Sequence, residues 1–178
     1  MRRLTQVAAF VTFTYVAPSL ADCGDMAKSL LGVELGGQRS YLTHLPAGLS
    51  LSPVKQDWKS SGIDVLTGNS HKIQFAQISV YWHKDRPASV IARVHGATTS
   101  SLDEALETIS SLASLQFTHD ARPDVYQLPC KDHLLVRARK GEIGRGAAKP
   151  VIPILMLSID HPLKVEMERD LRGVTKAK

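Results

Sequence analysis

The sequence predicts an α+β protein: a single domain whose mostly antiparallel sheet carries helices packed on one face, preceded by an N-terminal signal peptide. Two observations support this fold class. Segments in which apolar and polar residues alternate recur along the chain, which is typical of strands covered on one side. Other segments repeat apolar residues at helical spacing, and the resulting order is helix, strands, helix, strands, helix.

The start of the chain has the organisation of a cleavable export signal. Arg2 and Arg3 supply positive charge, residues 4–21 carry no charge, and small residues occupy positions 19 and 21. Cleavage is expected after Ala21, which leaves one globular domain, residues 22–178, in a periplasmic or secreted location. An uncleaved membrane anchor is the alternative, but polar residues and a proline interrupt its apolar run. We therefore expect no stable membrane insertion after cleavage.

The chain contains two cysteines, Cys23 and Cys130, and both lie in the expected mature domain. In an oxidising compartment such a pair is expected to form one disulfide bond. The bond would hold the N-terminal segment beside the start of a predicted strand at residues 133–139.

The first elements are a helix and short strands. Residues 22–31 are expected to form a short helix that ends at a glycine. Residues 39–45 alternate moderately and predict a strand, and residues 49–51 indicate another short strand. Residues 52–70 are interpreted as a polar, turn-rich stretch.

The clearest strand pattern runs from Lys72 to His83, where alternate residues are apolar. Residues 88–96 repeat this alternation, and Lys84 to Pro87 form the turn between the two strands. Matching the apolar faces pairs residue 82 with residue 88 and residue 76 with residue 94.

The strongest helix pattern follows at residues 101–113, where Ser101 and Glu104 have capping-box spacing. Its apolar stripe consists of Leu102, Ala105, Leu106, Ile109, Leu112 and Ala113.

The last third of the chain predicts two strands and a helix. A strand at residues 133–139 leads through a Gly-rich loop, residues 140–150, to a strand at residues 151–159. Pro153 indicates an edge position or a bulge in that strand. Pro162 opens the last helix and Gly173 caps it.

The motifs favour neither a metal centre nor a bound cofactor. His71, His83 and His95 are expected at exposed strand ends, too far apart to share an ion. Neither a structural zinc spacing nor a strained nucleophile turn occurs in the sequence. An exported hydrolase remains an alternative, with a site around His119, Asp120, Asp124 and His133.

The charge pattern argues against nucleic acid as the partner. The full chain has a net charge of +5, and residues of both signs are mixed along it. No basic run is interleaved with aromatic residues, as single-strand binding requires.

These exclusions favour an exported, non-catalytic binding protein, such as an immunity protein or inhibitor that neutralises a toxin or enzyme. Its expected partner is a protein with an acidic surface, because two predicted exposed segments carry basic residues. These residues are Lys84, Arg86, Lys140, Arg145 and Lys149. A small-ligand carrier with a pocket between the sheet and the Ser101 helix is a further alternative.

Overall fold

The computed structural model describes residues 23–58, 60–96, 99–112, 117–119, 125–128, 130, 135–143 and 152–176. The expected signal peptide, residues 1–21, lies outside these ranges, so its cleavage stays a prediction. Within them, no helix has the length and apolar character needed to cross a membrane.

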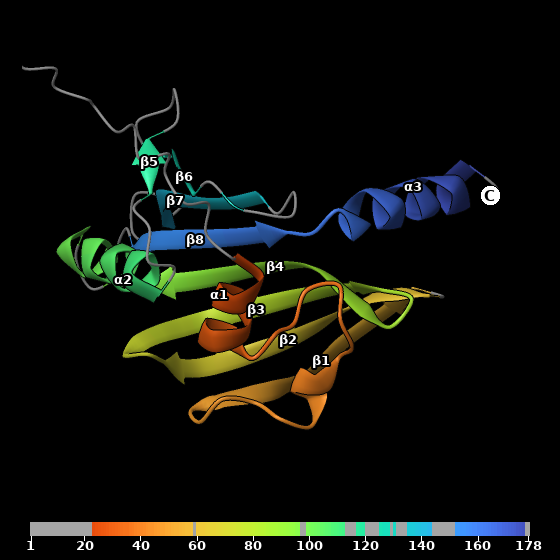
Figure 1. Ribbon diagram of the computed structural model, residues 1–178, viewed down its shortest axis with the longest axis horizontal. Helices are drawn as coiled ribbons and strands as arrows, with labels where there is room; N and C mark the ends of the chain where they lie inside the picture. The colour runs from red at the N-terminus through yellow and green to blue at the C-terminus, as the bar shows by residue number, and fades with distance from the viewer. Residues whose placement is uncertain are drawn as a thin grey trace, which may run out of the picture.

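Eight strands form one continuous antiparallel sheet (Figure 1). They are β1 (Leu49–Trp58), β2 (Ser61–Ser70), β3 (Ile73–His83), β4 (Arg86–His95), β5 (Thr118–His119), β6 (Val125–Leu128), β7 (Leu135–Ile143) and β8 (Ile152–Asp160). Their order is β1-β2-β3-β4-β8-β7-β6-β5, so two meanders of consecutive strands meet where β4 pairs with β8. With three α-helices, this architecture confirms the predicted α+β class.

Helices α1 (Cys23–Leu31) and α2 (Thr99–Leu112) pack on one face of the sheet, which we call the core face. The predicted apolar stripe of α2 is confirmed for Leu102, Ala105, Leu106 and Ile109, which are buried in the main cluster, and Leu112 is partly buried against it. Ala113 lies outside the described residues. The strands contribute Phe75, Ile78, Val80, Val90, Ala92, Val136, Leu155, Leu157 and Ile159 to the same cluster.

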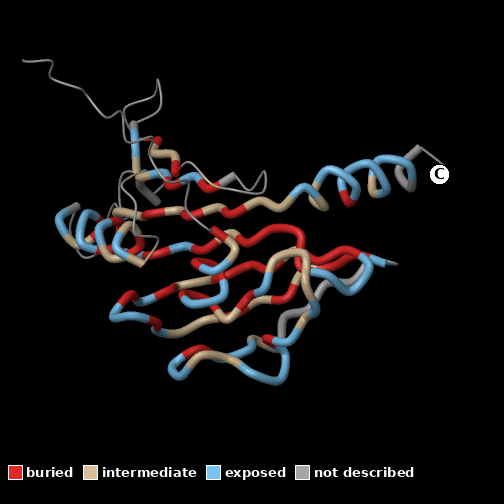
Figure 2. Tube along the Cα trace, in the orientation of Figure 1, coloured by how far each residue is buried: buried red, intermediate tan, exposed pale blue. Residues whose placement is uncertain are grey.

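Helix α3 (Leu163–Lys176) lies against the opposite face, which we call the outer face, so the helices do not all share one face. Its Asp170 contacts His83, and its Lys164 bonds Asp160. These two strand residues point away from the core face, because neighbours along a strand alternate. Met167 is buried, but most of α3 is exposed (Figure 2). Because the apolar stripe of α3 is narrow, the sequence does not indicate which face of the sheet this helix covers.

The β3–β4 hairpin confirms the strongest strand prediction. Ile78 pairs with Ala92, which is the register obtained by matching the apolar faces. The two predicted end pairs are wrong, because irregularities beside Gln77 and beside Trp82 shift the pairing by one residue. Val94 pairs with Phe75 and not with residue 76, and Trp82 pairs with Pro87 and not with residue 88. The turn that joins the strands is consequently shorter than predicted.

Two predictions in the first third of the chain are wrong. A short 3-10 helix, η1 (Ser40–Leu42), replaces the strand expected at residues 39–45. Most of the stretch interpreted as turns belongs to β1 and β2. The pattern of β2 was obscured because Asp64 occupies a buried position, where Tyr41 and Arg39 bind its carboxylate.

Strand β8 lies at the centre of the sheet, between β4 and β7, and not at an edge as Pro153 suggested. Pro153 is tolerated because it stands where the ladder with β4 ends. Its carbonyl oxygen accepts a hydrogen bond from the Gly96 N–H at 2.9 Å, and the proline has no N–H to return.

Of the predicted helix-end signals, Gly32 and Pro162 stand where expected, since α1 ends at Leu31 and α3 begins at Leu163, but the other two are misplaced. Helix α2 begins at Thr99, so Ser101 lies inside its first turn. Gly173 lies within α3, which continues to Lys176.

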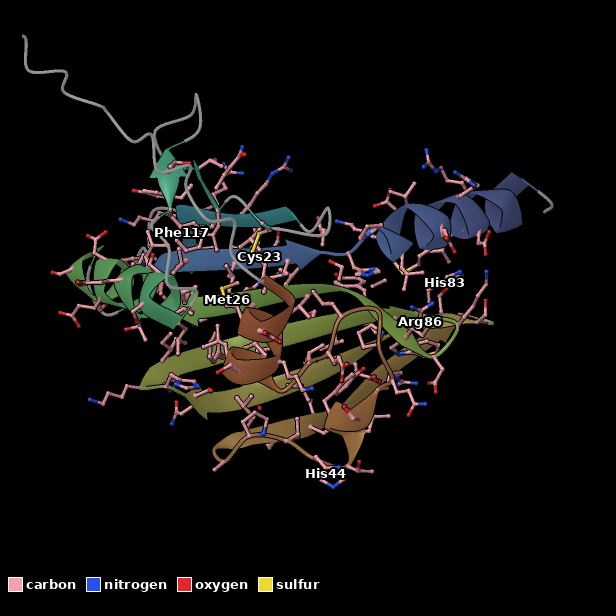
Figure 3. All side chains as sticks on the ribbon, viewed as in Figure 1. Cys23, Met26, His44, His83, Arg86 and Phe117 are labelled. Carbon is pink, nitrogen blue, oxygen red and sulfur yellow. A yellow bond between two sulfur atoms is a disulfide. The ribbon has the colours of Figure 1, made fainter. Side chains whose placement is uncertain are left out.

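The predicted disulfide joins Cys23 and Cys130, whose Cα atoms are 5.6 Å apart (Figure 3). Cys23 is fully buried at the start of α1, and Cys130 follows β6 in the second meander. The bond spans a sequence separation of 107 residues and therefore fastens the N-terminal helix to the second half of the sheet.

Candidate functional site

The β3–β4 turn presents two of the predicted partner-binding residues, and we call Lys84 to Arg86 the basic hairpin tip. Lys84 and Asp85 have positive φ values of 51° and 61°, as a tight two-residue hairpin turn requires. The Lys84 N–H donates to the Ser60 carbonyl oxygen, and Arg86 Nε donates to the Gly36 carbonyl oxygen, each at 2.6 Å. The tip is therefore braced against two other segments, while the Lys84 side chain is 61% exposed and its Nζ lies 4.0 Å from Asp170 Oδ2 of α3.

Asp85 connects the hairpin tip to a buried ion pair on the core face. Arg39 donates to Asp85 Oδ1 at 2.9 Å and to Asp64, and its guanidinium lies 4.2 Å from the centre of the Trp82 ring. Tyr41 Oη donates to Asp64 Oδ2 at 2.6 Å. Both members of the Arg39–Asp64 pair are almost completely buried.

The environment of this cluster keeps its Arg and Tyr protonated. Burial lowers the pKa of Arg39, but hydrogen bonds to Tyr41, Asp64 and Asp85 outweigh burial and raise it above its usual value. Burial and the hydrogen bond to Asp64 raise the pKa of Tyr41. The cluster therefore provides a fixed ion pair that fastens η1 and the hairpin tip to the sheet.

Lys140 lies in β7 and not in the loop predicted for residues 140–150. Its ammonium pairs with Asp103 of α2 and lies 5.2 Å from the centre of the Tyr126 ring. Burial lowers the pKa of Lys140, but its interactions with Asp103 and Tyr126 raise the pKa overall. Lys140 thus ties α2 to the sheet, while Arg145 and Lys149 lie outside the described residues.

A row of polar groups, buried at Ser61 and His83 and exposed at Asp170, links the outer face to α3. Ser61 Oγ is 2.7 Å from His83 Nδ1, and Asp170 Oδ2 is 3.3 Å from His83 Nε2, which makes no well-aligned hydrogen bond. These are the groups of a nucleophilic triad, but the serine contacts Nδ1 where a triad serine contacts Nε2. Ser61 is only 2% exposed, so a substrate has no access to its Oγ in this arrangement. The contacts between Ser61, His83 and Asp170 therefore hold α3 on the sheet.

His83 was expected at an exposed strand end and is instead completely buried. Figure 3 places it beside Arg86, at the end of the sheet near α3. His71 and His95 are exposed, as predicted.

A second polar contact fastens α3 at the end of β8. Asp160 Oδ1 accepts a hydrogen bond from Ser89 Oγ at 2.5 Å, and Asp160 Oδ2 accepts one from Lys164 Nζ at 2.8 Å. His161 caps the helix, because its Nδ1 accepts the Leu163 N–H at 3.1 Å. Accepting at Nδ1 requires that this nitrogen carry no proton.

We predict that the stability of the protein falls with decreasing pH in part through His161. Burial and the positive charge of Arg86 lower the pKa of His161 below its usual 6.5. Below pH 6.5 the unfolded chain therefore binds a proton that the folded chain does not yet bind, so the free energy of unfolding decreases until the folded pKa is passed.

The control is His161→Asn, whose side-chain oxygen retains a cap and does not titrate. Urea unfolding at pH 7.5 and pH 5.5 should show a larger loss of stability for the wild type than for the variant. Equal losses would show that His161 contributes nothing to the pH dependence.

The structure does not describe the side chains on which the hydrolase alternative depends. His119 belongs to β5, and its side chain together with Asp120, Asp124 and His133 lies outside the described residues. Among the side chains that the structure describes, no group of three or more His, Cys, Asp or Glu is placed to hold a metal ion.

Three arginines that no sequence motif singled out lie on the outer face: Arg93 in β4 and Arg137 and Arg139 in β7. All three are exposed. Met156 of β8 pairs with both Arg93 and Arg139 and therefore lies between them. Alternation within each strand assigns these arginines to the outer side, but only the insertion of β8 between β4 and β7 brings them together.

Comparison of the chain with protein-family models, with curated proteins and with solved structures yields no significant match.

Proposed function

We propose that this chain is an exported, non-catalytic binding protein, such as an immunity protein or enzyme inhibitor, that binds the acidic surface of a protein partner. The observation that carries the proposal is the basic hairpin tip, where Lys84 and Arg86 stand on a braced turn. Loops held by a rigid scaffold often carry recognition residues. A contact that is ordered before binding also loses less conformational entropy on association.

Export is supported by two features of the chain. The first 21 residues have the order of charged, apolar and small residues that signal peptidases recognise. The Cys23–Cys130 bond belongs to a class of covalent link that persists in oxidising compartments. Together they favour a periplasmic or secreted location.

The two alternatives gain less support. The exported hydrolase depends on side chains outside the described residues, and the buried Ser61 gives it no accessible nucleophile. No contact among the described residues favours the small-ligand carrier. Both remain proposals of lower rank.

Variants of Lys84 test whether the hairpin tip contacts the partner. The partner is first recovered from the exported fraction on immobilised, disulfide-intact protein, and its dissociation constant is then measured by calorimetric titration. Lys84→Asn removes the charge and suits a positive φ. We expect binding about tenfold weaker, which corresponds to about 1.4 kcal/mol for one lost interfacial contact.

The matched control is Lys72→Asn, in the β2–β3 turn. Lys72 also has a positive φ, of 65°, and lies at the other end of β3, about 35 Å away. It should bind the partner like the wild type. Equal weakening by both variants would indicate a general charge effect, and unchanged binding by Lys84→Asn would exclude the hairpin tip.

A further inference from the structure

We infer that Asp170 of α3 occupies the position at the basic hairpin tip that a carboxylate of the protein partner takes in the complex, an inference that rests on the proposed function. Helix α3 then restrains binding, because the partner must displace Asp170 before it contacts Lys84. Lys84 thus belongs to a surface that the chain itself partly occupies.

Asp170 presents one carboxylate oxygen to two groups at the hairpin end of the sheet. Its Oδ2 lies 3.3 Å from His83 Nε2 and 4.0 Å from Lys84 Nζ. Figure 3 shows α3 beside His83. A carboxylate that approaches Lys84 from another protein meets the charge of Asp170, and two like charges in close contact repel strongly. The two carboxylates therefore compete for one position.

The other charges of the hairpin tip favour an incoming anion. The Asp85 carboxylate accepts a hydrogen bond from Arg39 at 2.9 Å, so its charge is already compensated. Arg86 Nε donates to a main-chain carbonyl oxygen, and this neutral acceptor leaves the positive charge in place. An acidic side chain of the partner would pair with Lys84 and Arg86 once Asp170 has moved away.

The contact made by Asp170 is weak enough for a partner to replace it. The side chains of Lys84 and Asp170 are 61% and 53% exposed, and water screens a pair of this kind strongly. His83 Nε2 makes no well-aligned hydrogen bond to the carboxylate. Release of Asp170 therefore breaks neither a fully buried ion pair nor a well-formed hydrogen bond.

The packing of α3 allows its C-terminal half to move. Among the side chains that the structure describes in this helix, Met167 alone is buried. The His161 cap and the bond from Lys164 to Asp160 hold the start of the helix. Asp170 lies six residues beyond Lys164, which corresponds to about 9 Å along the helix axis. Asp170 can therefore leave the hairpin tip by a movement about the start of α3, without a change in the sheet.

The test uses the full-length, disulfide-intact protein and a short poly-L-glutamate peptide, whose dissociation constant is measured by fluorescence anisotropy at fixed ionic strength. Asp170→Asn removes the competing charge and keeps the size and the helix propensity of the side chain. We expect this variant to bind the peptide at least threefold more tightly than the wild type, because a larger fraction of the protein is ready to bind.

The matched control is Glu168→Gln, which removes the same charge from the same helix. Glu168 is exposed and lies about 200° around the helix from Asp170, so it does not face the hairpin tip. This variant should bind the peptide within twofold of the wild type. Adding Asp170→Asn to Lys84→Asn should strengthen binding by less than twofold, since the group with which Asp170 interferes is then absent. Thermal unfolding verifies that each variant folds.

Hydrogen–deuterium exchange of the wild type tests the displacement without any substitution. Saturating peptide should speed exchange of the main-chain amides of α3 at least threefold and leave those of α2 unchanged, because α3 gives up its contact with the hairpin tip. Unchanged or slower exchange in α3 would overturn the inference, as would equal tightening by Asp170→Asn and Glu168→Gln.

Two further outcomes separate the inference from the proposed function. If Lys84→Asn weakens peptide binding and Asp170→Asn does not strengthen it, Asp170 does not compete with the partner, while the proposed function stands. If Lys84→Asn binds the peptide as the wild type does, or if neither the wild type nor Asp170→Asn binds it, both proposals fail.

Discussion

Replacing Arg39 by methionine is expected to lower the free energy of unfolding by about 3–5 kcal/mol. The change leaves Asp64 buried without its cation, with Tyr41 as its remaining hydrogen-bond partner. It also removes the contact with Asp85 and the guanidinium above the Trp82 ring. Urea unfolding followed by tryptophan fluorescence and circular dichroism measures the loss.

Two controls isolate the buried charge as the cause. Lys28→Met breaks an exposed ion pair with Glu34, in which both side chains are more than half exposed, and should cost less than about 1 kcal/mol. Combining Arg39→Met with Asp64→Leu removes both charges and should recover much of the loss. A loss below about 1 kcal/mol for Arg39→Met alone would show that the pair is not needed to hold the fold.

Removing the disulfide is the other change with a large expected effect. Cys23→Ala combined with Cys130→Ala should lower the free energy of unfolding by about 3–5 kcal/mol, because the bond restricts the unfolded chain over a separation of 107 residues. We expect α1 to lose its packing against the sheet before the rest of the fold does, because the bond fastens this helix to the second meander.

The comparison includes the wild type in its oxidised and reduced forms. The reduced wild type and the double variant should unfold at similar, lower urea concentrations. If the reduced protein keeps the unfolding midpoint of the oxidised protein, the bond contributes nothing to stability, and the anchoring of α1 must come from its buried residues Met26, Leu30 and Leu31 alone.

The parts of the fold that were predictable are those with strong local periodicity. Strands β3 and β4 alternate regularly enough to give the register of their middle residues, and α2 carries a continuous apolar stripe. Strand β2 was not predictable, because its inward Asp64 is compatible with burial only in the presence of Arg39, 25 residues away in the sequence. The central position of β8 likewise depends on pairing with distant strands, which a single proline does not reveal.

In the candidate sites too, features that depend on local sequence were predictable, and contacts between distant segments were not. Alternation places Lys84 and Arg86 near a turn, but the bracing by Ser60 and Gly36 comes from segments that meet only in the folded chain. His83 occupies a polar strand position that periodicity marks as exposed, and α3 covers it from far along the sequence. Strand order brings Arg93, Arg137 and Arg139 together on the outer face, and these three residues carry no motif.

The most direct test of binding to an acidic protein partner is the dissociation constant of the recovered complex, measured by calorimetric titration between 50 mM and 500 mM salt. Added salt screens attraction between exposed charges, so the predicted result is a complex at least tenfold weaker at the higher concentration. Affinity that is unchanged or strengthened by salt would contradict a complex held by the basic hairpin tip.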